Sequence, residues 1–331
     1  MVQNGLNGLD IPSRTLTSVD GPLAGTADTT SYLYDTSGRV TRVTMPEGNY
    51  VQYTYDARGN VTEERHVSKT PGTPADIVLD ANYDATCANP VKCNEPNWTK
   101  DALGNQTDYT YDATHGGVLT VTKPAATTGG TRPKVTYTYA TKHAYYYQSG
   151  SIVASPVATY RLTAMSTCMT TASCTGTADE SKTAINYGPQ TSGVGNNLLP
   201  VSVTKSIGDG SVSETTTLAY DSVGNVTSVD GPLGADNSFF FYDALRRKTG
   251  SISPDPDGTG TSPYPAQRTT YDTQGRPYLV ETGTATAQTS AALAAMTVLG
   301  SQVTTYDAVD HPLTVTSNGS DGAAFALTQA K

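Results

Sequence analysis

The sequence predicts an all-β protein, a long antiparallel sheet of irregular hairpins with one short helix. The 331-residue chain contains 21 Tyr but only 4 Phe, and Tyr favours pleated, half-exposed strands. Its 31 Gly and 19 Pro supply turns. A short Tyr-Asp motif also recurs along the chain, which is typical of repeat architectures.

The composition excludes several classes of protein. Charged residues make up 15% of the chain, well below the roughly 25% of ordinary soluble domains, which argues against disorder. A net charge of −9 without a basic stripe gives no support for a nucleic-acid partner. No apolar segment reaches the length of a membrane span. The N-terminus, residues 1–5, has neither a basic start nor an apolar run, so we expect no signal peptide in this chain.

The motif is clearest at residues 32–41, Tyr-Leu-Tyr-Asp-Thr-Ser-Gly-Arg-Val-Thr, and returns at residues 53–62. Two aromatic side chains at i and i+2 lie on the same face of a strand. The Asp side chain accepts from the N–H groups of a turn, and the Gly three residues later takes the left-handed conformation that ends a hairpin loop with a bulge. Each Tyr-Asp unit therefore predicts one hairpin.

Further copies lie at residues 109–112, 218–227, 240–249, 269–276 and 304–310, and a version without Tyr lies at residues 100–107. The residues to which we assign this strand and turn signature are Tyr34, Asp35, Gly38, Tyr55, Asp56, Gly59, Tyr111, Asp112, Tyr220, Asp221, Gly224, Tyr242, Asp243, Tyr271, Asp272, Gly275, Tyr306 and Asp307. Two copies have another residue at the glycine position. Asp310 tolerates the left-handed conformation, whereas Arg246 does so less readily, so we expect that hairpin to turn differently.

The repeat predicts one continuous array over residues 1–331 without a separate catalytic domain. Its units are clear at 17–140 and 201–311 and match weakly at 141–200. The hexapeptide Ser-Val-Asp-Gly-Pro-Leu occurs twice, at 18–23 and 228–233, each time before a Tyr-Asp unit. Residues 289–299 are rich in Ala and place Leu293, Met296 and Leu299 at helical spacing. They predict a short helix with Ser290 as its cap.

These units resemble the Rhs/YD-repeat family, whose signature is Tyr-Asp followed by x-x-Gly-Arg or x-x-Gly-Asn and a branched residue. The resemblance runs from about residue 17 to residue 311. It implies a long sheet that spirals, in a solenoid-like way, into a hollow shell around a C-terminal toxin. Since 331 residues are few for a closed shell, we expect an incomplete shell or an open sheet.

The resemblance implies a non-enzymatic structural segment of such a shell, or of an extended surface scaffold, that encloses or presents a C-terminal effector. The protein would be exported and would act outside the cell or at its surface. Its partners would be other parts of a longer polypeptide or its toxin cargo, and open sheet edges would allow self-association. The alternative is a cell-surface module for carbohydrate binding and adhesion, since surface relatives have been linked to carbohydrate.

No set of residues in the sequence converges on catalysis, a cofactor or a metal. The Asp residues of the units have a sufficient task as turn caps, whereas a glycosidase needs two carboxylates across one cleft. The histidines His66, His115, His143 and His311 are scattered, without the Gly-x-Ser-x-Gly elbow of a serine hydrolase. Residues 255–260 look like half a calcium loop but lack its remaining ligands. We therefore expect no enzymatic activity and no cofactor.

The four cysteines form two pairs of equal spacing, Cys87 with Cys93 and Cys168 with Cys174. Local disulfides are favoured and would indicate an oxidising compartment, while free thiols and a metal site stay open as alternatives.

Two aromatic side chains, Trp98 and Tyr146, are candidate sugar contacts on the expectation that their rings are exposed. Tyr146 lies at the centre of a run of three tyrosines. Packing within the sheet is the alternative role for both side chains.

Overall fold

The computed structural model describes residues 2–4, 15–23, 25, 27–258, 260–319 and 324–328. These residues form 25 strands and one helix, and all but β12 and β13 of the strands belong to one antiparallel sheet. The prediction of an all-β antiparallel fold with one short helix is confirmed. No helix in the described ranges is long and apolar enough to cross a membrane.

The chain divides into two compact units. The first comprises Met1–Thr138 and Met165–Ser181, and the second comprises Tyr139–Ala164 and Lys182–Lys331. Three strands, β11, β14 and β15, contain residues of both units. The continuous array over residues 1–331 stays a prediction, as does the way in which the sheet curves.

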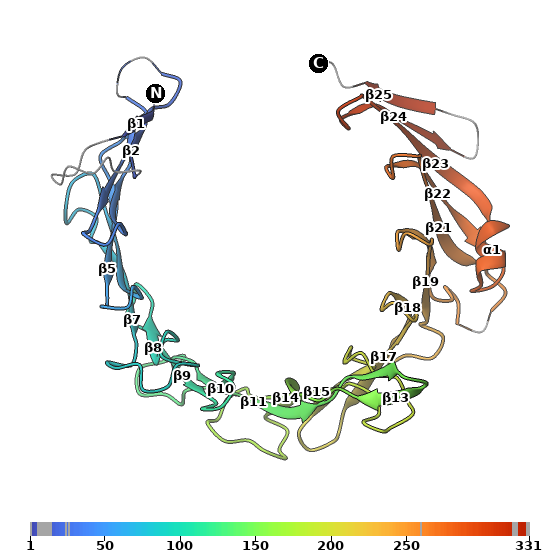
Figure 1. The fold of residues 1–331 in the computed structure, drawn as a ribbon, viewed down its shortest axis with the longest axis horizontal. Coiled ribbons are helices and arrows are strands. Elements are labelled where there is room, and N and C mark those ends of the chain that lie inside the picture. The colour runs from blue at the N-terminus through green and yellow to red at the C-terminus, as the bar shows by residue number, and fades with distance from the viewer. Residues whose placement is uncertain are drawn as a thin grey trace. The chain divides into compact units, whose positions relative to one another are not determined.

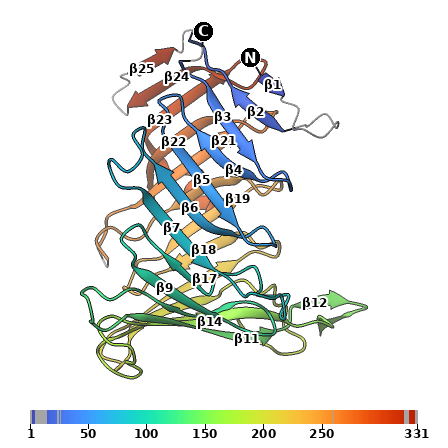
Figure 2. The same ribbon diagram turned by 90° about the vertical axis from the view of Figure 1, so that its left-hand side faces the viewer.

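In the first unit each strand pairs antiparallel with the next one along the chain, from β1 to β11. Figure 2 shows β3 to β7 of this series side by side. The strands are β1 (Val2–Asn4), β2 (Leu16–Val19), β3 (Thr30–Tyr34), β4 (Val40–Thr44), β5 (Tyr50–Tyr55), β6 (Val61–Val67), β7 (Ile77–Asn82), β8 (Trp98–Lys100), β9 (Gln106–Tyr111), β10 (Val118–Thr122) and β11 (Lys134–Lys142).

The second unit repeats this arrangement from β16 to β25, and the chain order of its strands can be followed in Figure 1. A separate hairpin, β12 with β13, precedes the series. The elements are β12 (Tyr145–Gln148), β13 (Ser151–Ala154), β14 (Thr159–Cys168), β15 (Glu180–Asn186), β16 (Ser202–Ile207), β17 (Ser213–Tyr220), β18 (Val226–Asp230), β19 (Ser238–Tyr242), β20 (Lys248–Ile252), β21 (Tyr264–Tyr271), β22 (Pro277–Ala285), α1 (Ser290–Ala294), β23 (Thr297–Tyr306), β24 (Pro312–Gly319) and β25 (Ala324–Thr328).

The hairpins of the Tyr-Asp units share one irregularity of register. In each, the pairing shifts at the tyrosine that precedes the Asp: Tyr34 pairs with Val40, for example, next to the pair Leu33 and Arg42. The same shift occurs at Tyr55, Tyr220, Tyr242, Tyr271 and Tyr306. This extra residue is the β-bulge expected when a three-residue loop ends in a left-handed residue.

Few hydrophobic side chains are fully buried, because most residues of the sheet are only half covered. The main apolar cluster lies where α1 packs on β20 and β21, and it joins Ile252, Ala266, Ala285, Leu293 and Met296. Gly250 makes this approach feasible, since a Cβ atom there would lie 2.5 Å from a methyl carbon of Leu293. With so small a core, the hydrogen-bonded turns carry much of the stability.

The helix departs from the sequence-based expectation in two ways. It ends at Ala294, and residues from Thr297 onward form β23, because β-branched Thr297 and Val298 favour an extended strand. The cap is Thr289 and not Ser290: the Thr289 hydroxyl accepts from the main-chain N–H of Ala292. Thr289 has an extended backbone, as a cap residue needs, whereas Ser290 is already helical.

The expectation that the Arg246 hairpin turns differently is wrong. Arg246 adopts a left-handed φ of 64°, and its N–H donates to the carbonyl of Asp243 as the glycine does in the other units. The remaining bonds of the turn hold Arg246 in this conformation, at a steric cost of about 1–2 kcal/mol.

This cost leads to a first prediction. Arg246→Gly should raise the free energy of unfolding by about 0.5–1 kcal/mol, because relief of steric strain exceeds the entropy that glycine adds to the unfolded chain. Urea unfolding followed by circular dichroism measures the change. Gly224→Ala, at φ 92° in another unit, is the matched control and should destabilise. An Arg246→Gly variant of lower stability than the parent would contradict the prediction.

Candidate functional site

Each Tyr-Asp unit closes its turn with the Asp side chain. In the unit at Asp35, one carboxylate oxygen accepts from the main-chain N–H groups of Ser37 and Arg39, both at 2.9 Å. The main chain closes the same loop, because Asp35 N–H donates to the carbonyl of Arg39 and Gly38 N–H to that of Asp35. The same side-chain bonds are made by Asp56, Asp101, Asp221, Asp243, Asp272 and Asp307. In the unit at Asp112 the loop is one residue longer, and Gly116 takes the left-handed position.

The second carboxylate oxygen of the Asp is held by the side chain four residues later. Arg39 donates its Nε to Asp35 at 2.6 Å, and Asn60 donates its amide to Asp56 at 2.8 Å. The other donors of this kind are Asn105, Asn225, Arg247 and Arg276, and His311 lies 3.4 Å from Asp307. Sequence reasoning assigned no task to this position, although the Arg or Asn after Gly was part of the repeat signature.

These hydrogen bonds keep the Asp side chains ionised. The main-chain N–H of Arg39 is the largest influence on Asp35 and lowers the pKa of its carboxyl. Burial raises the pKa of Asp56, but hydrogen bonds from Asn60 and Arg58 outweigh burial, so the pKa is lowered overall. The pKa values of Asp101, Asp112, Asp221, Asp243 and Asp272 are lowered as well.

In all but one of the Tyr-Asp units, the tyrosine before the Asp ties the hairpin to an upstream segment of the chain. Tyr55 donates its hydroxyl to the carbonyl of Val40 at 2.6 Å, and Tyr271 donates to that of Lys248 at 2.9 Å. In these cases, and for Tyr306, the acceptor is the first residue of the return strand in the preceding unit. Tyr34, Tyr111 and Tyr220 bond to carbonyls of other upstream segments. Within the described residues, Tyr242 makes no such bond.

Arginine at the fourth position after the Asp adds a second link between neighbouring units. The guanidinium of Arg276 lies 4.7 Å from the ring centre of Tyr306 in the next unit, and it also donates to the carbonyl of Asp307 and to the carboxylate of Asp310. Arg39 stacks in the same way on Tyr55, and Arg247 on Tyr271. An asparagine side chain is too short to contact the tyrosine of the next unit. Units with Arg at this position are therefore coupled to the following unit through that side chain, and units with Asn are not.

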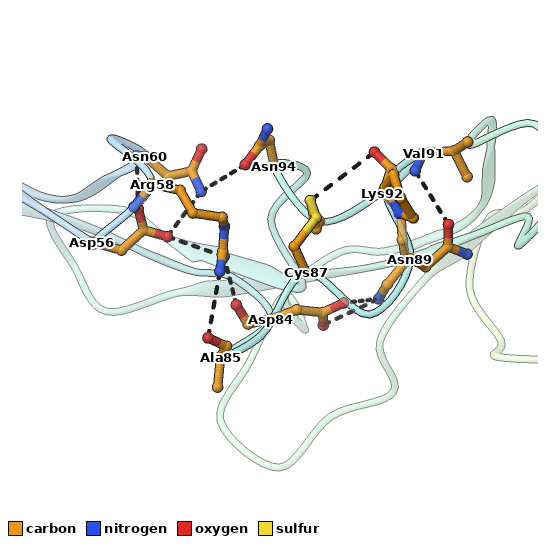
Figure 3. The surroundings of a disulfide bond; sticks show 12 residues. Asp56, Arg58, Asn60, Asp84, Ala85, Cys87, Asn89, Val91, Lys92 and Asn94 are labelled. Atoms are coloured by element: carbon orange, nitrogen blue, oxygen red, sulfur yellow. Dashed lines mark hydrogen bonds and ion pairs between the residues drawn. A yellow bond between two sulfur atoms is a disulfide. The ribbon is translucent and has the colours of Figure 1, made fainter.

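The first cysteine pair fixes an inserted loop beside the Asp56 turn (Figure 3). Cys87 and Cys93 are joined by a disulfide. Arg58, a residue of the turn, donates to the carbonyls of Asp84 and Ala85. The Asn60 amide donates to the side-chain oxygen of Asn94, the residue directly after Cys93, at 3.2 Å. The turn residues of one repeat unit thereby hold an insertion in place.

The second cysteine pair, Cys168 with Cys174, is also a disulfide. It encloses a loop next to Glu180, a buried carboxylate that accepts from Ser166 and from the N–H of Gly176. Asp179 lies close enough to both sulfurs to suggest a metal site, but the two sulfur atoms are bonded to each other. Hydroxyls of Thr171 and Thr170 hold the Asp179 carboxylate and lower its pKa to about 2.

The four histidines each make local contacts. His66 pairs with Glu64 at 2.7 Å, and His143 bonds to the carbonyl of Ser155. His115 accepts from the N–H of Gly117 within its own turn. These contacts fit a structural task, as the position of His311 in the Asp307 turn does.

A cavity of about 560 Å³ lies in the second unit, beside β12. Its walls include Tyr145 and Tyr146 of β12, Tyr187 after β15, and Tyr220 at the end of β17. The loop of residues 195–197 and the turn residues Asp221 and Ser222 complete it. Sequence reasoning missed this site as a whole, because its walls come from segments far apart along the chain.

The two candidate sugar contacts differ in their surroundings. Tyr146 is 42% exposed and lines the cavity of the second unit. Trp98 is half-buried in β8 of the first unit, with the Lys100 ammonium 4.9 Å from its ring centre. The structure therefore provides a concave site at Tyr146, whereas Trp98 packs against its strand neighbour.

Comparison with known proteins identifies part of the repeat. Residues 34–70 match the model of the RHS Repeat, which confirms the resemblance over the units at Asp35 and Asp56. No curated protein matches the sequence.

Among solved structures, the crystal structure of TcdB2-TccC3-TEV is 14% identical, with 89% of this chain and 16% of that chain covered and a TM-score of 0.26. The Tc holotoxin pore of Photorhabdus luminescens is 13% identical over 89% of this chain and 18% of its own, also at 0.26. A porin-like protein from Bacteroides uniformis is 14% identical over 90% of both chains, at 0.27. Scores of this size carry no argument about function, and this chain spans less than a fifth of the two toxin chains.

A second prediction concerns the coupling of units. Arg276→Ala should lower the free energy of unfolding measurably, because it removes the partly exposed ion pair with Asp272 and the contact with the Tyr306 ring. Arg276→Lys should recover little of this loss, since a lysine lacks the planar fork. Lys182→Ala, at an exposed lysine, serves as control. Equal stability of the Arg276→Ala and Lys182→Ala variants would refute the coupling.

A third prediction concerns pH. The Asp carboxyls have lower pKa values in the folded state, so they stabilise the protein fully above their unfolded pKa of about 3.9. This stabilisation is lost as the pH falls through the lower pKa values that the carboxyls have in the folded state. The urea midpoint should therefore be constant from pH 7 to 5 and fall steeply below pH 4. Asp56→Asn should reduce this dependence, and Asp230→Asn, at an exposed strand end, should not. An unchanged midpoint at pH 3 would contradict the account.

Proposed function

From the RHS Repeat at residues 34–70, we propose that the chain is a non-enzymatic segment of an Rhs-type β-shell or extended surface scaffold. It would belong to a longer polypeptide that encloses or presents a C-terminal effector. The observation that supports this proposal most is the use of the repeat side chains. Within the coupled units the Asp, Arg and Tyr groups bond to one another and to the backbone, which builds a sheet.

The state of the Asp residues supports a structural task over a catalytic one. A general acid at neutral pH needs a raised pKa, and burial next to another acid is the usual way to obtain it. The unit carboxyls have lowered pKa values because their own turns donate to them. They therefore serve as turn caps.

Disulfides support an exported protein. The bonds Cys87–Cys93 and Cys168–Cys174 form and persist in oxidising surroundings, as found outside the cell and at its surface. The partners of the chain would be other parts of the same polypeptide or its toxin cargo. Pairing of open sheet edges with a second copy is a further contact that such an array allows.

Protease protection tests the enclosing function in the complete polypeptide. A protease site placed in the effector segment should resist cleavage in the folded protein and be cut after denaturation. The same site placed in the exposed turn at residues 127–130 is the matched control and should be cut at once. Equal cleavage at both positions would reject enclosure of the effector.

A second candidate function is carbohydrate binding at the cell surface, and the cavity beside Tyr146 favours it. The intact chain should then bind members of a glycan array. Absence of binding to every glycan would reject this candidate and leave the structural proposal untouched.

A further inference from the structure

We propose that the cavity beside β12 binds a neutral saccharide, with Tyr146 as its stacking platform and Asn197 and Ser222 as its polar contacts. The inference deepens the second candidate function and rests on it. Part of its lining, from Tyr145 to Asn197, lies in the stretch where the repeat pattern is weakest, and the rest belongs to the repeat unit at Asp221 and the segment before it. Its volume of about 560 Å³ falls in the usual range for small-molecule sites.

The aromatic wall of the cavity is held in place before any ligand enters. Tyr145 and Asn196 exchange two main-chain hydrogen bonds, at 2.8 and 2.9 Å. The side chain of Gln190 accepts from His143 N–H and donates to the His143 carbonyl, just before the hairpin of β12 and β13. Such preorganisation lowers the entropy lost on binding.

Hydrogen bonds of Asn196 and Tyr187 also hold the floor of the cavity in place. The Asn196 amide donates to the carbonyls of Tyr187 and Pro189 and its oxygen accepts from Leu198 N–H. Tyr187 is 8% exposed, and its hydroxyl donates to the carbonyl of Leu162. The Asn196 amide and the Tyr187 hydroxyl therefore shape the cavity, and other side chains are left to bind a ligand.

The charge of the lining disfavours an anionic ligand. Among the described residues, no lysine, arginine or histidine lines the cavity, and Asp221 is the one acidic residue that does. Both Asp221 oxygens already accept hydrogen bonds, from Val223 and from the main chain and amide of Asn225. An anionic ligand would meet no cation and would lie near the Asp221 carboxylate, so the lining disfavours anions.

The remaining groups match a sugar ring. Among the described residues, the Asn197 amide nitrogen and the Ser222 hydroxyl have no hydrogen-bond partner, although the Asn197 oxygen accepts from Leu199 N–H. The amide nitrogen donates and the hydroxyl both donates and accepts, as contacts to sugar hydroxyls require. A saccharide also presents a face of C–H groups, which packs on an exposed tyrosine ring such as that of Tyr146.

Saturation-transfer NMR and calorimetry on the intact chain test this site. The probes are glucose, galactose, mannose, N-acetylglucosamine, cellobiose and chitobiose, with glucuronic acid as the charged comparison. At least one neutral probe should bind, and glucuronic acid should not. Tyr146→Ala should weaken the binding roughly tenfold, as loss of an aromatic anchor does, and Asn197→Ala should weaken it severalfold.

The matched control is Tyr147→Ala. This neighbour is 74% exposed and does not line the cavity, so its loss should leave affinity unchanged, and circular dichroism confirms that each variant is folded. Equal losses in Tyr146→Ala and Tyr147→Ala, or binding of glucuronic acid alone, would overturn the inference. If the chain binds glycans and Tyr146→Ala retains that binding, the second candidate function stands and this site is wrong. If no saccharide binds, both are wrong.

Discussion

The carboxylate of one Asp in each repeat unit is the constraint on which the rest of the fold depends. It closes a three-residue loop by accepting from two main-chain N–H groups, as at Asp35, and fixes the bulge at the preceding tyrosine. The bulge sets the register of the hairpin, and register decides which face of the sheet each side chain reaches. Because the apolar core of this sheet is small, these hydrogen-bond networks provide stability that side-chain packing provides in proteins with larger cores.

The residue four positions after the Asp decides how far that local network extends. Arg276 contacts its own Asp272 and the next unit at Tyr306 and Asp310. Asn60 satisfies its own Asp56 and holds the inserted disulfide loop at Asn94. Arginine units thus contact the following unit through this side chain, whereas within the described residues the asparagine units do not. Stability in repeat proteins is often a sum of unit and neighbour contributions, and arginine at this position adds to the neighbour contribution.

Much of the fold follows from local sequence rules. The spacing of Asp and Gly predicts hairpins, and alanine with leucine spacing locates the helix, because these signals depend on residues close together in the chain. The left-handed conformation of Arg246 could not be predicted this way, because the hydrogen bonds of the whole turn override the local conformational preference of arginine. The cavity beside Tyr146 could not be predicted either. Its walls at Tyr187 and Tyr220 meet only after the intervening strands have folded.

Native-state hydrogen exchange tests the central claim most directly, because it reports the opening of individual turns. In an Arg276→Ala variant, the main-chain amides of Asp307 and His311 in the following turn should exchange faster, together with those of the Asp272 turn. In an Asn225→Ala variant, faster exchange should stay within the Asp221 turn and not reach the Asp243 turn. If both substitutions affect only their own turn, arginine does not couple the repeat units, and the account is wrong.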